Sequence, residues 1–225
     1  MSKILITGAG SGLGASLRDR LVAEGHTVLP YDIALNPEHN VSRPVNTWGD
    51  TLDVLINCAG VNKIEWLENV TDADWDEVIG VNAKGIFKMT QAAMPALAVR
   101  LGTVLNVVSN AAHMPMTCSL AYNASKGAAH IMTLQLAREL TKKYGITVFG
   151  IAPNKLRGTG MSKSIDRQVV RTRGWTEEYA HQYQLNGLLT GEETDPGTLA
   201  EFIAFLLANK QRHRFLSGCI IPYGA

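Results

Sequence analysis

The stretch Ile4-Leu5-Ile6-Thr7-Gly8-Ala9-Gly10-Ser11-Gly12-Leu13-Gly14 joins a short apolar strand to a glycine-rich turn. A helix pattern follows, with leucines four residues apart up to Leu21 and Gly25 as the expected C-terminal stop. Glycines let a backbone turn tightly and approach a pyrophosphate, which then lies on the helix N-terminus among free N–H groups. Strand, turn and helix in this order predict a nucleotide-binding unit, although an ordinary turn is the alternative. The candidate cofactor-binding residues of this turn are Gly8, Ser11, Gly12, Leu13 and Gly14.

A second strand, residues 26–32, ends at Asp32, which follows Gly14 by 18 residues (32 − 14). An acid at this position can accept hydrogen bonds from ribose hydroxyls and would repel a 2′-phosphate. Ser11 occupies the turn where a basic residue would help to bind that phosphate. Both features favour NAD over NADP as the cofactor. The alternative for Asp32 is a turn residue at the end of a strand.

Residues 36–51 are polar and contain two prolines, so we expect a trimmed crossover with a short strand near residues 39–41. Residues 52–56 form the next buried strand and lead into Asn57-Cys58-Ala59-Gly60. Small residues at the end of a strand let a cofactor lie against the backbone. Asn57, Ala59 and Gly60 are therefore candidate cofactor-binding residues.

Thr71-Asp72-Ala73-Asp74 resembles a capping box and begins a long helix that we expect to reach about Ala98. Asn82 falls inside this helix. An amide in the middle of a helix prefers a backbone partner or a bound water, and the alternative is a polar residue on the helix surface.

Ser109 ends a strand over residues 102–109, at the edge of a parallel sheet where ligands bind. Tyr122 and Lys126, four residues apart, lie on one face of the following helix. An ammonium beside a phenol favours the phenolate, so this pair is a candidate proton donor and acceptor. A solvated helix turn is the alternative from this motif alone. His113 and Met114, on the connecting loop, are candidate substrate contacts, with simple loop packing as the alternative.

Residues 154–195 are predicted to form a helical lid over the substrate. The segment contains six basic residues and three aromatic ones: Lys155, Arg157, Lys163, Arg167, Arg171, Arg173, Trp175, Tyr179 and Tyr183. The cations could meet an anionic group of the substrate, but a solvated helix face is the commoner explanation. A last helix over residues 197–208 and a last strand over residues 218–222 complete the chain.

Length and composition exclude several functional classes. The chain has 225 residues, of which 46% are hydrophobic, and a net charge of +1, which fits one domain over residues 1–225. The charge gives no reason to expect nucleic acid or a membrane as partner. We expect no membrane span, signal peptide, disulfide framework or metal site, and a cytoplasmic location. Alternating strands and helices predict a doubly wound parallel sheet in a three-layer αβα sandwich.

Together these residues resemble the short-chain dehydrogenase/reductase family, in its compact single-domain branch, over nearly the whole chain. The resemblance rests on Thr7-Gly8-x-x-x-Gly12-x-Gly14, Asn57-x-Ala59-Gly60, Asn82, Ser109, Tyr122-x-x-x-Lys126, and Pro153 with Thr159. It implies a Rossmann-like sheet of about seven parallel strands and a nicotinamide cofactor. It also implies hydride transfer between a small-molecule alcohol and its ketone, and a homotetramer or homodimer.

The resemblance also implies individual roles. Tyr122 would be the general acid and base, and Ser109 would orient the reacting oxygen. Lys126 would hold the nicotinamide ribose and, with the oxidised ring, lower the pKa of Tyr122. Asn82 would hold a water that links Lys126 to solvent.

Pro153 and Thr159 would contact the cofactor. Asn154 stands where the family usually has glycine, and it is a further candidate substrate contact. Two other functional classes stay open: a non-catalytic nucleotide-binding regulator, and an epimerase or dehydratase that recycles its cofactor. A plain oligomeric scaffold would leave the glycine turn and Asp32 unexplained.

Overall fold

The computed structural model describes residues 1–209 and 213–224, which fold around a single six-stranded parallel sheet. The sheet order is β2-β1-β3-β4-β5-β6, and every neighbouring pair is parallel. The strands are β1 (Lys3–Thr7), β2 (Thr27–Tyr31), β3 (Val54–Asn57), β4 (Thr103–Val107), β5 (Thr147–Pro153) and β6 (Ile220–Tyr223). The doubly wound α/β fold is thus confirmed, with six strands in place of the seven expected.

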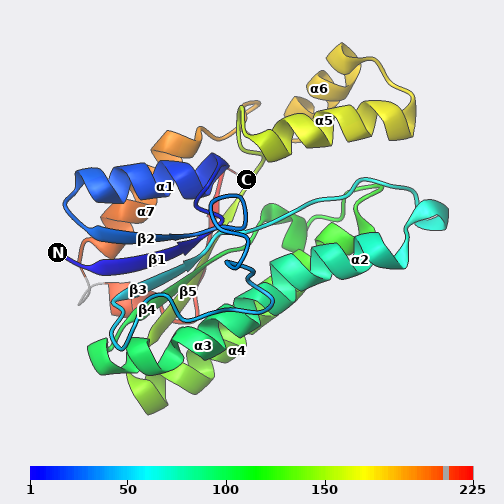
Figure 1. Cartoon of the computed structure of the whole chain (residues 1–225). Coiled ribbons are helices and arrows are strands. Elements are labelled where there is room, and N and C mark those ends of the chain that lie inside the picture. Colours follow the sequence, from blue (N-terminus) through cyan, green and yellow to red (C-terminus); the bar gives the residue numbers. More distant parts are fainter. Residues whose placement is uncertain (210–212, 225) are drawn as a thin grey trace.

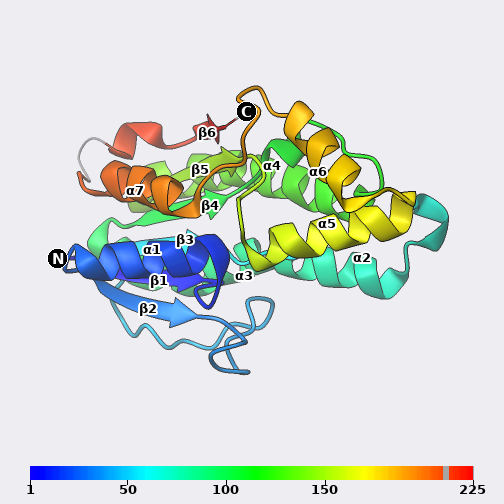
Figure 2. The ribbon, with the colours of Figure 1, turned by 90° about the horizontal axis from the view of Figure 1, so that it is seen from above.

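Helices cover both faces of the sheet, as Figures 1 and 2 show. α1 (Gly12–Ala23) and α7 (Pro196–Leu207) pack on one face, and α3 (Gly85–Arg100) and α4 (Leu120–Tyr144) pack on the other. Successive strand residues point to opposite faces. Ile4 and Ile6 accordingly pack with α1 and α7, whereas Leu5 between them packs with α3 and α4.

The direction in which the chain adds strands to the sheet reverses at β1. From β1 the chain crosses to β2 on one side, and it then returns to β3 on the other side. In an open parallel sheet this reversal leaves a crevice at the carboxyl ends of the strands, where ligands bind. Thr7, Asn57 and Val107 all end their strands at this edge.

The strand expected near residues 39–41 is absent, since the described chain from Asp32 to Asp53 contains no strand. Its asparagines explain why. The Asn36, Asn40 and Asn46 side chains each accept a hydrogen bond from a backbone N–H two residues further along the chain. Such local turns compete with strand pairing.

Side-chain packing fixes this segment beside the edge strand β2. His39 stacks on Tyr31 with their ring centres 4.3 Å apart, and the buried Trp48 contacts Tyr31 edge-on. The Trp48 carbonyl accepts a hydrogen bond from the Lys3 ammonium. The segment therefore protects one edge of the sheet without adding a strand.

The long helical stretch is confirmed, with one irregularity. α2 (Asp72–Ile79) is capped by the preceding residue Thr71, whose hydroxyl accepts a hydrogen bond from the Asp74 N–H at 3.1 Å. A π-helical turn over Gly80–Lys84 then leads into α3, which ends at Arg100. π-helical turns inside helices often mark functional positions, and this one contains Asn82.

Two further helices, α5 (Gly160–Arg173) and α6 (Glu177–Asn186), lie beyond the carboxyl ends of the strands (Figure 1). Val169 and Ala180 pack in a small separate core with Ile64 and Cys118. Three short 3₁₀ turns occupy Leu67–Asn69, Asn110–Ala112 and Arg214–Leu216. In the part of the chain that the structure describes, no helix is both long and apolar enough to cross a membrane.

Candidate active site

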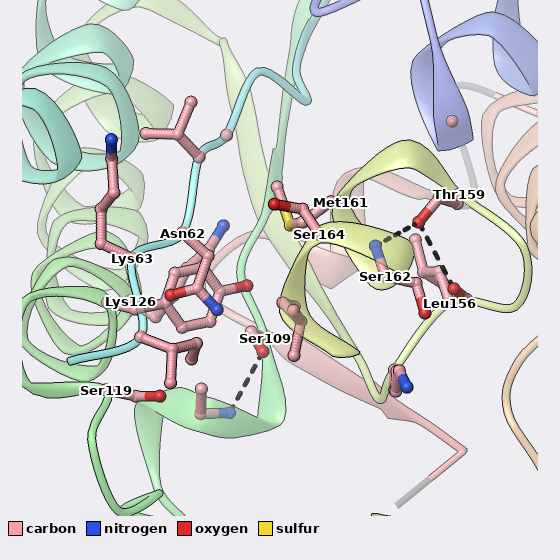
Figure 3. A pocket seen from close by; sticks show the side chains of 18 of the residues that line it. Asn62, Lys63, Ser109, Ser119, Lys126, Leu156, Thr159, Met161, Ser162 and Ser164 are labelled. Atoms are coloured by element: carbon pink, nitrogen blue, oxygen red, sulfur yellow. Dashed lines mark hydrogen bonds between the residues drawn. The ribbon is translucent and has the colours of Figure 1, made fainter. Parts of the chain in front are cut away.

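A cavity of about 1280 Å³ lies at the carboxyl edge of the sheet, between the glycine turn and α5 (Figure 3). Most of the predicted site residues line it. They are Gly8, Ser11, Gly12, Leu13, Gly14, Asp32, Ala59, Gly60, Ser109, Met114, Tyr122, Lys126, Pro153, Asn154 and Thr159. The structure thus brings the predicted cofactor and catalytic residues, except Asn57 and Asn82, to one continuous surface.

The glycine turn is packed too closely for other residues at two positions. A Cβ atom at Gly14 would lie 2.0 Å from the Gly8 carbonyl oxygen, and one at Gly8 would lie 2.7 Å from the Ala59 Cα. Gly8 also has a φ of +70°, which glycine adopts most readily. The Thr7 hydroxyl accepts hydrogen bonds from the Cys58 and Ala59 N–H groups at 3.0 and 3.1 Å, and so joins the turn to the end of β3.

The first turn of α1 fits a pyrophosphate. Ser11 precedes the helix, and within the described residues its side chain makes no capping hydrogen bond. The first turn contains no acidic residue, so its N–H groups and the helix dipole favour an anion. A Cβ atom at Gly12 would lie 3.5 Å from the Thr159 methyl carbon. Thr159 therefore borders the glycine turn directly.

Asp32 is fixed beside this turn. One carboxylate oxygen accepts a hydrogen bond from the Gly10 N–H at 2.8 Å, and the other accepts one from the Ala34 N–H at 2.8 Å. Each carboxylate oxygen has a second lone pair. The side chain can therefore still accept hydrogen bonds from a diol in the cavity.

Asn57 does not line the cavity, although Ala59 and Gly60 do. Its side chain is buried and donates to the Asn106 amide oxygen at 2.9 Å and to the Thr90 hydroxyl at 3.3 Å. Asn106 in turn donates to Thr133 on α4 at 3.0 Å. Asn57 thus belongs to a buried polar network that joins β3, β4, α3 and α4, which the sequence did not predict.

Lys126 and Tyr122 face each other on the first turns of α4. The Lys126 ammonium nitrogen is 5.7 Å from the centre of the Tyr122 ring and donates to the Val107 carbonyl at 2.9 Å. Burial lowers the pKa of Lys126 to about 8. Burial also raises the pKa of Tyr122, while a hydrogen bond with the Ser109 hydroxyl acts to lower it.

The net direction for Tyr122 is opposite to the one expected from a neighbouring ammonium. Loss of water around the phenol disfavours the phenolate, and this effect outweighs the opposing hydrogen bond with Ser109. Ser109 is positioned by its own local structure, because its hydroxyl accepts a hydrogen bond from the Ala111 N–H at 3.1 Å. Two hydroxyls of different acidity beside a buried amine can exchange a proton with a bound oxygen.

Asn82 is fully buried, so the alternative of a surface-facing amide is wrong. Its amide oxygen accepts from the Val61 N–H at 2.8 Å, and its amide nitrogen donates to the Val61 carbonyl and the Ser125 hydroxyl. A Cβ atom at Gly60 would lie 3.5 Å from the Asn82 oxygen and 4.0 Å from the Lys126 nitrogen. Asn82 and Lys126 therefore flank the same glycine, while the water between them stays a prediction.

The three candidate substrate residues differ in position. Met114 lines the cavity, whereas His113 does not and packs edge-on against His130 with ring centres 4.3 Å apart. Asn154 lines the cavity, but its amide is committed to the chain after α6. It accepts from the Thr194 N–H at 3.2 Å and donates to the Glu192 carbonyl at 3.4 Å.

Three of the six basic residues of the lid segment, Lys155, Arg157 and Arg171, are paired with carboxylates. Lys155 lies 2.5 Å from Asp166 and 2.8 Å from Glu193, and Arg171 lies 3.1 Å from Glu65. Arg173 instead donates to the Thr117 carbonyl and stacks over Trp175. The pairing weakens the case for a strongly anionic substrate.

Several cavity residues were missed by the sequence motifs, and Asn62 is one of them. Asn62 lines the cavity, and its amide oxygen and nitrogen are buried with no hydrogen-bond partner among the described residues. It follows Gly60 by two positions, and no motif singles it out. Among residues 1–209 and 213–224, no three His, Cys, Asp or Glu side chains group as metal ligands.

The chain is similar to several known proteins. A family model described as short chain dehydrogenase matches residues 38–169. Sorbitol-6-phosphate 2-dehydrogenase of Klebsiella pneumoniae is 27% identical, over 91% of this chain and 88% of that protein.

Two further similarities extend over nearly the whole chain. The 2,3-dihydro-2,3-dihydroxybenzoate dehydrogenase of Escherichia coli (strain K12) is 27% identical, over 99% of this chain and 96% of that protein. The solved 3-ketoacyl-(acyl-carrier-protein) reductase from Brucella melitensis, complexed with NADH, is 25% identical with a TM-score of 0.80. That comparison covers 98% of this chain and 96% of the other.

Proposed function

Because the chain belongs to the short-chain dehydrogenase family, we propose that it transfers a hydride between NAD and a small secondary alcohol or its ketone. One observation carries the proposal. Ser109, Tyr122 and Lys126 line the same cavity as the glycine turn and Asp32. The cavity therefore offers a proton-transfer group and a dinucleotide surface side by side.

The chain's own residues divide the binding of the cofactor between them. The N-terminus of α1 would hold the pyrophosphate, and the glycine turn would let it approach the backbone. Asp32 would accept hydrogen bonds from the adenosine ribose and repel a 2′-phosphate, which favours NAD over NADP. Lys126 would hold the second ribose, with Pro153 and Thr159 bordering the ring. When bound, the nicotinamide supplies or accepts the hydride.

The proton moves through Tyr122. In oxidation the phenolate takes the proton of the substrate hydroxyl, and in reduction the phenol returns it. Ser109 donates a hydrogen bond to the same substrate oxygen and so aligns it with the phenol. The ammonium of Lys126 lies over the Tyr122 ring and stabilises the phenolate that forms. Asn82, beside Lys126 at Gly60, would hold the water that returns the proton to solvent.

The relatives' names support an alcohol or ketone substrate. Two are dehydrogenases named for sorbitol 6-phosphate and for a dihydroxybenzoate derivative, and a third is a ketoacyl reductase. We extend the proposal to residues 154–195, which would act as the substrate lid, and to a homotetramer or homodimer in the cytoplasm. None of these features is needed for the chemistry at Tyr122.

The decisive experiment combines cofactor binding with turnover. Melting temperatures are compared with NAD and with NADP, and NADH production or consumption is then followed over a panel of alcohols and ketones. The proposal expects a larger shift with NAD and turnover of at least one secondary alcohol or ketone. Binding without turnover of any compound would favour a nucleotide-binding regulator. Conversion of a substrate with no net change in NADH would indicate an epimerase or dehydratase.

A further inference from the structure

Asn123 directly follows Tyr122 on α4, and its side chain reaches back to the loop that precedes this helix. The amide nitrogen donates to the Ala111 carbonyl at 2.6 Å and to the Met114 carbonyl at 3.1 Å. The amide oxygen accepts from the Met116 N–H at 3.4 Å. A carboxamide has two N–H donors and one acceptor oxygen. All three functions of the Asn123 side chain are therefore spent on backbone groups of the loop between β4 and α4.

Ala111 connects this contact to Ser109. The Ala111 carbonyl accepts from Asn123, and the N–H of the same residue donates to the Ser109 hydroxyl oxygen at 3.1 Å (Figure 3). A hydroxyl group has one donor and two acceptor positions. Because the Ala111 N–H occupies one acceptor position, the O–H group of Ser109 and its other lone pair remain for partners in the cavity, which Ser109 lines. Ala111 is buried, so water does not readily replace either bond.

The helix side of the contact is fixed independently of the Asn123 side chain. The Ser125 hydroxyl donates to the Tyr122 carbonyl at 2.7 Å and accepts from the buried Asn82 amide at 3.0 Å. The Asn123 backbone N–H donates to the Ser119 carbonyl at 2.9 Å. Removal of the Asn123 side chain should therefore release the loop and leave the backbone of Tyr122 in place.

The two hydroxyls of the site are joined at their other end as well. Burial raises the pKa of Tyr122, and a hydrogen bond with the Ser109 hydroxyl acts against this rise. A closed path of contacts thus runs from Tyr122 through Ser109 and Ala111 to Asn123, which is bonded covalently to Tyr122. The Asn123 amide is the side chain that closes this path.

We propose that Asn123 is a positioning residue, which holds Ala111 so that the Ser109 hydroxyl stays aligned with Tyr122 on one substrate oxygen. This inference rests on the proposed function and adds a residue that touches neither the substrate nor the cofactor. Its effect on the reaction passes through Ser109. A residue that only shaped the loop would change the fit of the substrate and leave the two hydroxyls as they are.

The test is a double-mutant cycle of Asn123→Leu and Ser109→Ala in the full-length chain. Leucine is close to asparagine in size and favours a helix, but its side chain forms no hydrogen bonds. We expect kcat for alcohol oxidation to fall about ten- to a hundredfold in Asn123→Leu, because the reacting groups are misaligned, while the KM for NAD changes by less than about twofold. In the Ser109→Ala background the same substitution should change kcat by less than about twofold, since the group that it positions is already absent.

The matched control is Gln135→Leu. It removes an exposed amide of the same helix, which donates to Glu139 at 2.7 Å, and it should keep the wild-type kcat. An equal loss of kcat from Asn123→Leu in both backgrounds would overturn the inference, because Asn123 would then act independently of Ser109. A rise in the KM for substrate with an unchanged kcat would assign Asn123 to the shape of the loop and overturn it equally.

A second measurement needs no turnover and so separates this inference from the proposed function. NMR of the chain labelled at the tyrosine carbon that bears the hydroxyl gives the fraction of Tyr122 present as phenolate at about pH 10. Tyr122→Phe assigns the signal among the six tyrosines. Loss of the aligned Ser109 hydroxyl should lower this fraction in Asn123→Leu as much as in Ser109→Ala, and no further in the double variant.

The two measurements fail in different ways. If no alcohol or ketone is turned over, the proposed function fails, and the phenolate fraction still decides the place of Asn123. A lowered fraction in Asn123→Leu, with Gln135→Leu like the wild type, supports the inference. A wild-type fraction in Asn123→Leu would overturn it.

Discussion

The Lys126 ammonium faces the ring of Tyr122 one helical turn away, with its nitrogen 5.7 Å from the ring centre, while it donates to the Val107 carbonyl. Lys126 is buried and Tyr122 is partly buried. Burial shifts each pKa against the charged form, upward for the phenol and downward to about 8 for the amine. Burial therefore favours the neutral form of each group, although Lys126 still keeps its proton below about pH 8, and the ionisation of both can be followed by pH.

Tyr122→Phe should remove the proton-transfer group and leave the cavity intact. We expect kcat for alcohol oxidation to fall by about a hundred- to ten-thousand-fold, with the Kd for NAD unchanged. Oxidation needs the phenolate, and the pKa of Tyr122 is raised, so wild-type oxidation should increase with pH into the alkaline range. Reduction of the ketone needs the neutral phenol, so its rate should fall in the alkaline range. Steady-state rates across pH check this, with Tyr144→Phe at the end of α4 as control. A Tyr122→Phe variant that keeps the wild-type turnover rate would refute the role of Tyr122 as the proton-transfer group.

Lys126→Met should stabilise the folded chain, while it weakens NAD binding and lowers turnover. The pKa of Lys126 is lowered from 10.5 to about 8, so the unfolded chain binds a proton more readily than the folded one. The free-energy cost of burying the charged amine is complete below about pH 8 and disappears as pH rises through 10.5. After the lost Val107 hydrogen bond is subtracted, we expect the variant to gain about 1–2 kcal/mol in free energy of unfolding at neutral pH.

That gain should shrink as pH rises from about 8 toward 10. The NAD affinity and the turnover of the variant should both be lower than those of the wild type. Urea unfolding at several pH values measures the first effect, and NAD titration measures the second. Lys143→Met, which removes an exposed lysine of the same helix, is the control. A variant less stable than wild type at every pH would contradict the burial penalty.

The parts of the site that the sequence predicted are those set by local geometry. The glycine turn, Asp32, and the Tyr122 and Lys126 pair each depend on residues a few positions apart, or on the end of a strand. The missing strand after β2 depends on a competition between asparagine turns and pairing, which spacing does not reveal.

The errors concern groups whose state depends on distant neighbours. Asn57 turns into the protein because Asn106 and Thr90 offer buried partners from other elements. The raised pKa of Tyr122 reflects burial by the whole fold, which a motif does not encode. Asn62 was missed because only the assembled cavity shows that its amide has no partner.

Asp32→Asn should relax the choice of cofactor. The substitution keeps an oxygen that accepts hydrogen bonds and removes the negative charge that repels a 2′-phosphate. We expect the kcat/KM for NAD divided by that for NADP to fall by about tenfold or more, mainly because NADP binds more tightly. Asp50→Asn, on the loop before β3, is the control. An unchanged ratio would show that another group selects the cofactor.

Gly14→Ala should disrupt the turn itself. The new Cβ atom would lie 2.0 Å from the Gly8 carbonyl oxygen, which is backbone and can give way only if the turn opens. We expect the free energy of unfolding to fall by about 2–4 kcal/mol and NAD binding to weaken strongly. Gly127→Ala is the matched control, because a Cβ atom there meets nothing within 4 Å and replaces a mid-helix glycine. Equal behaviour of the two variants would contradict this account.

Lys155→Met should loosen the segment over residues 154–195 without unfolding the sheet. Lys155 follows β5 and lies between Asp166 on α5 and Glu193 after α6, and the Gln184 amide of α6 donates to the same Asp166 oxygen. Glu193 is only 9% exposed, so removing the cation leaves a buried carboxylate unpaired. Because Asp166 is 38% exposed and partly screened, we expect a local cost of about 2–3 kcal/mol, at the lower end for broken buried pairs.

Hydrogen exchange should then speed up in α5 and α6 while β4 keeps its protection, and the KM for substrate should rise more than the KM for NAD. The triple variant Lys155→Met, Asp166→Asn, Glu193→Gln removes the charges together and should recover most of the protection, because no unpaired charge remains. Uniform loss of protection across the sheet would instead make Lys155 a support of the whole fold. Failure of the triple variant to recover would show that packing, and not charge, holds these helices in place.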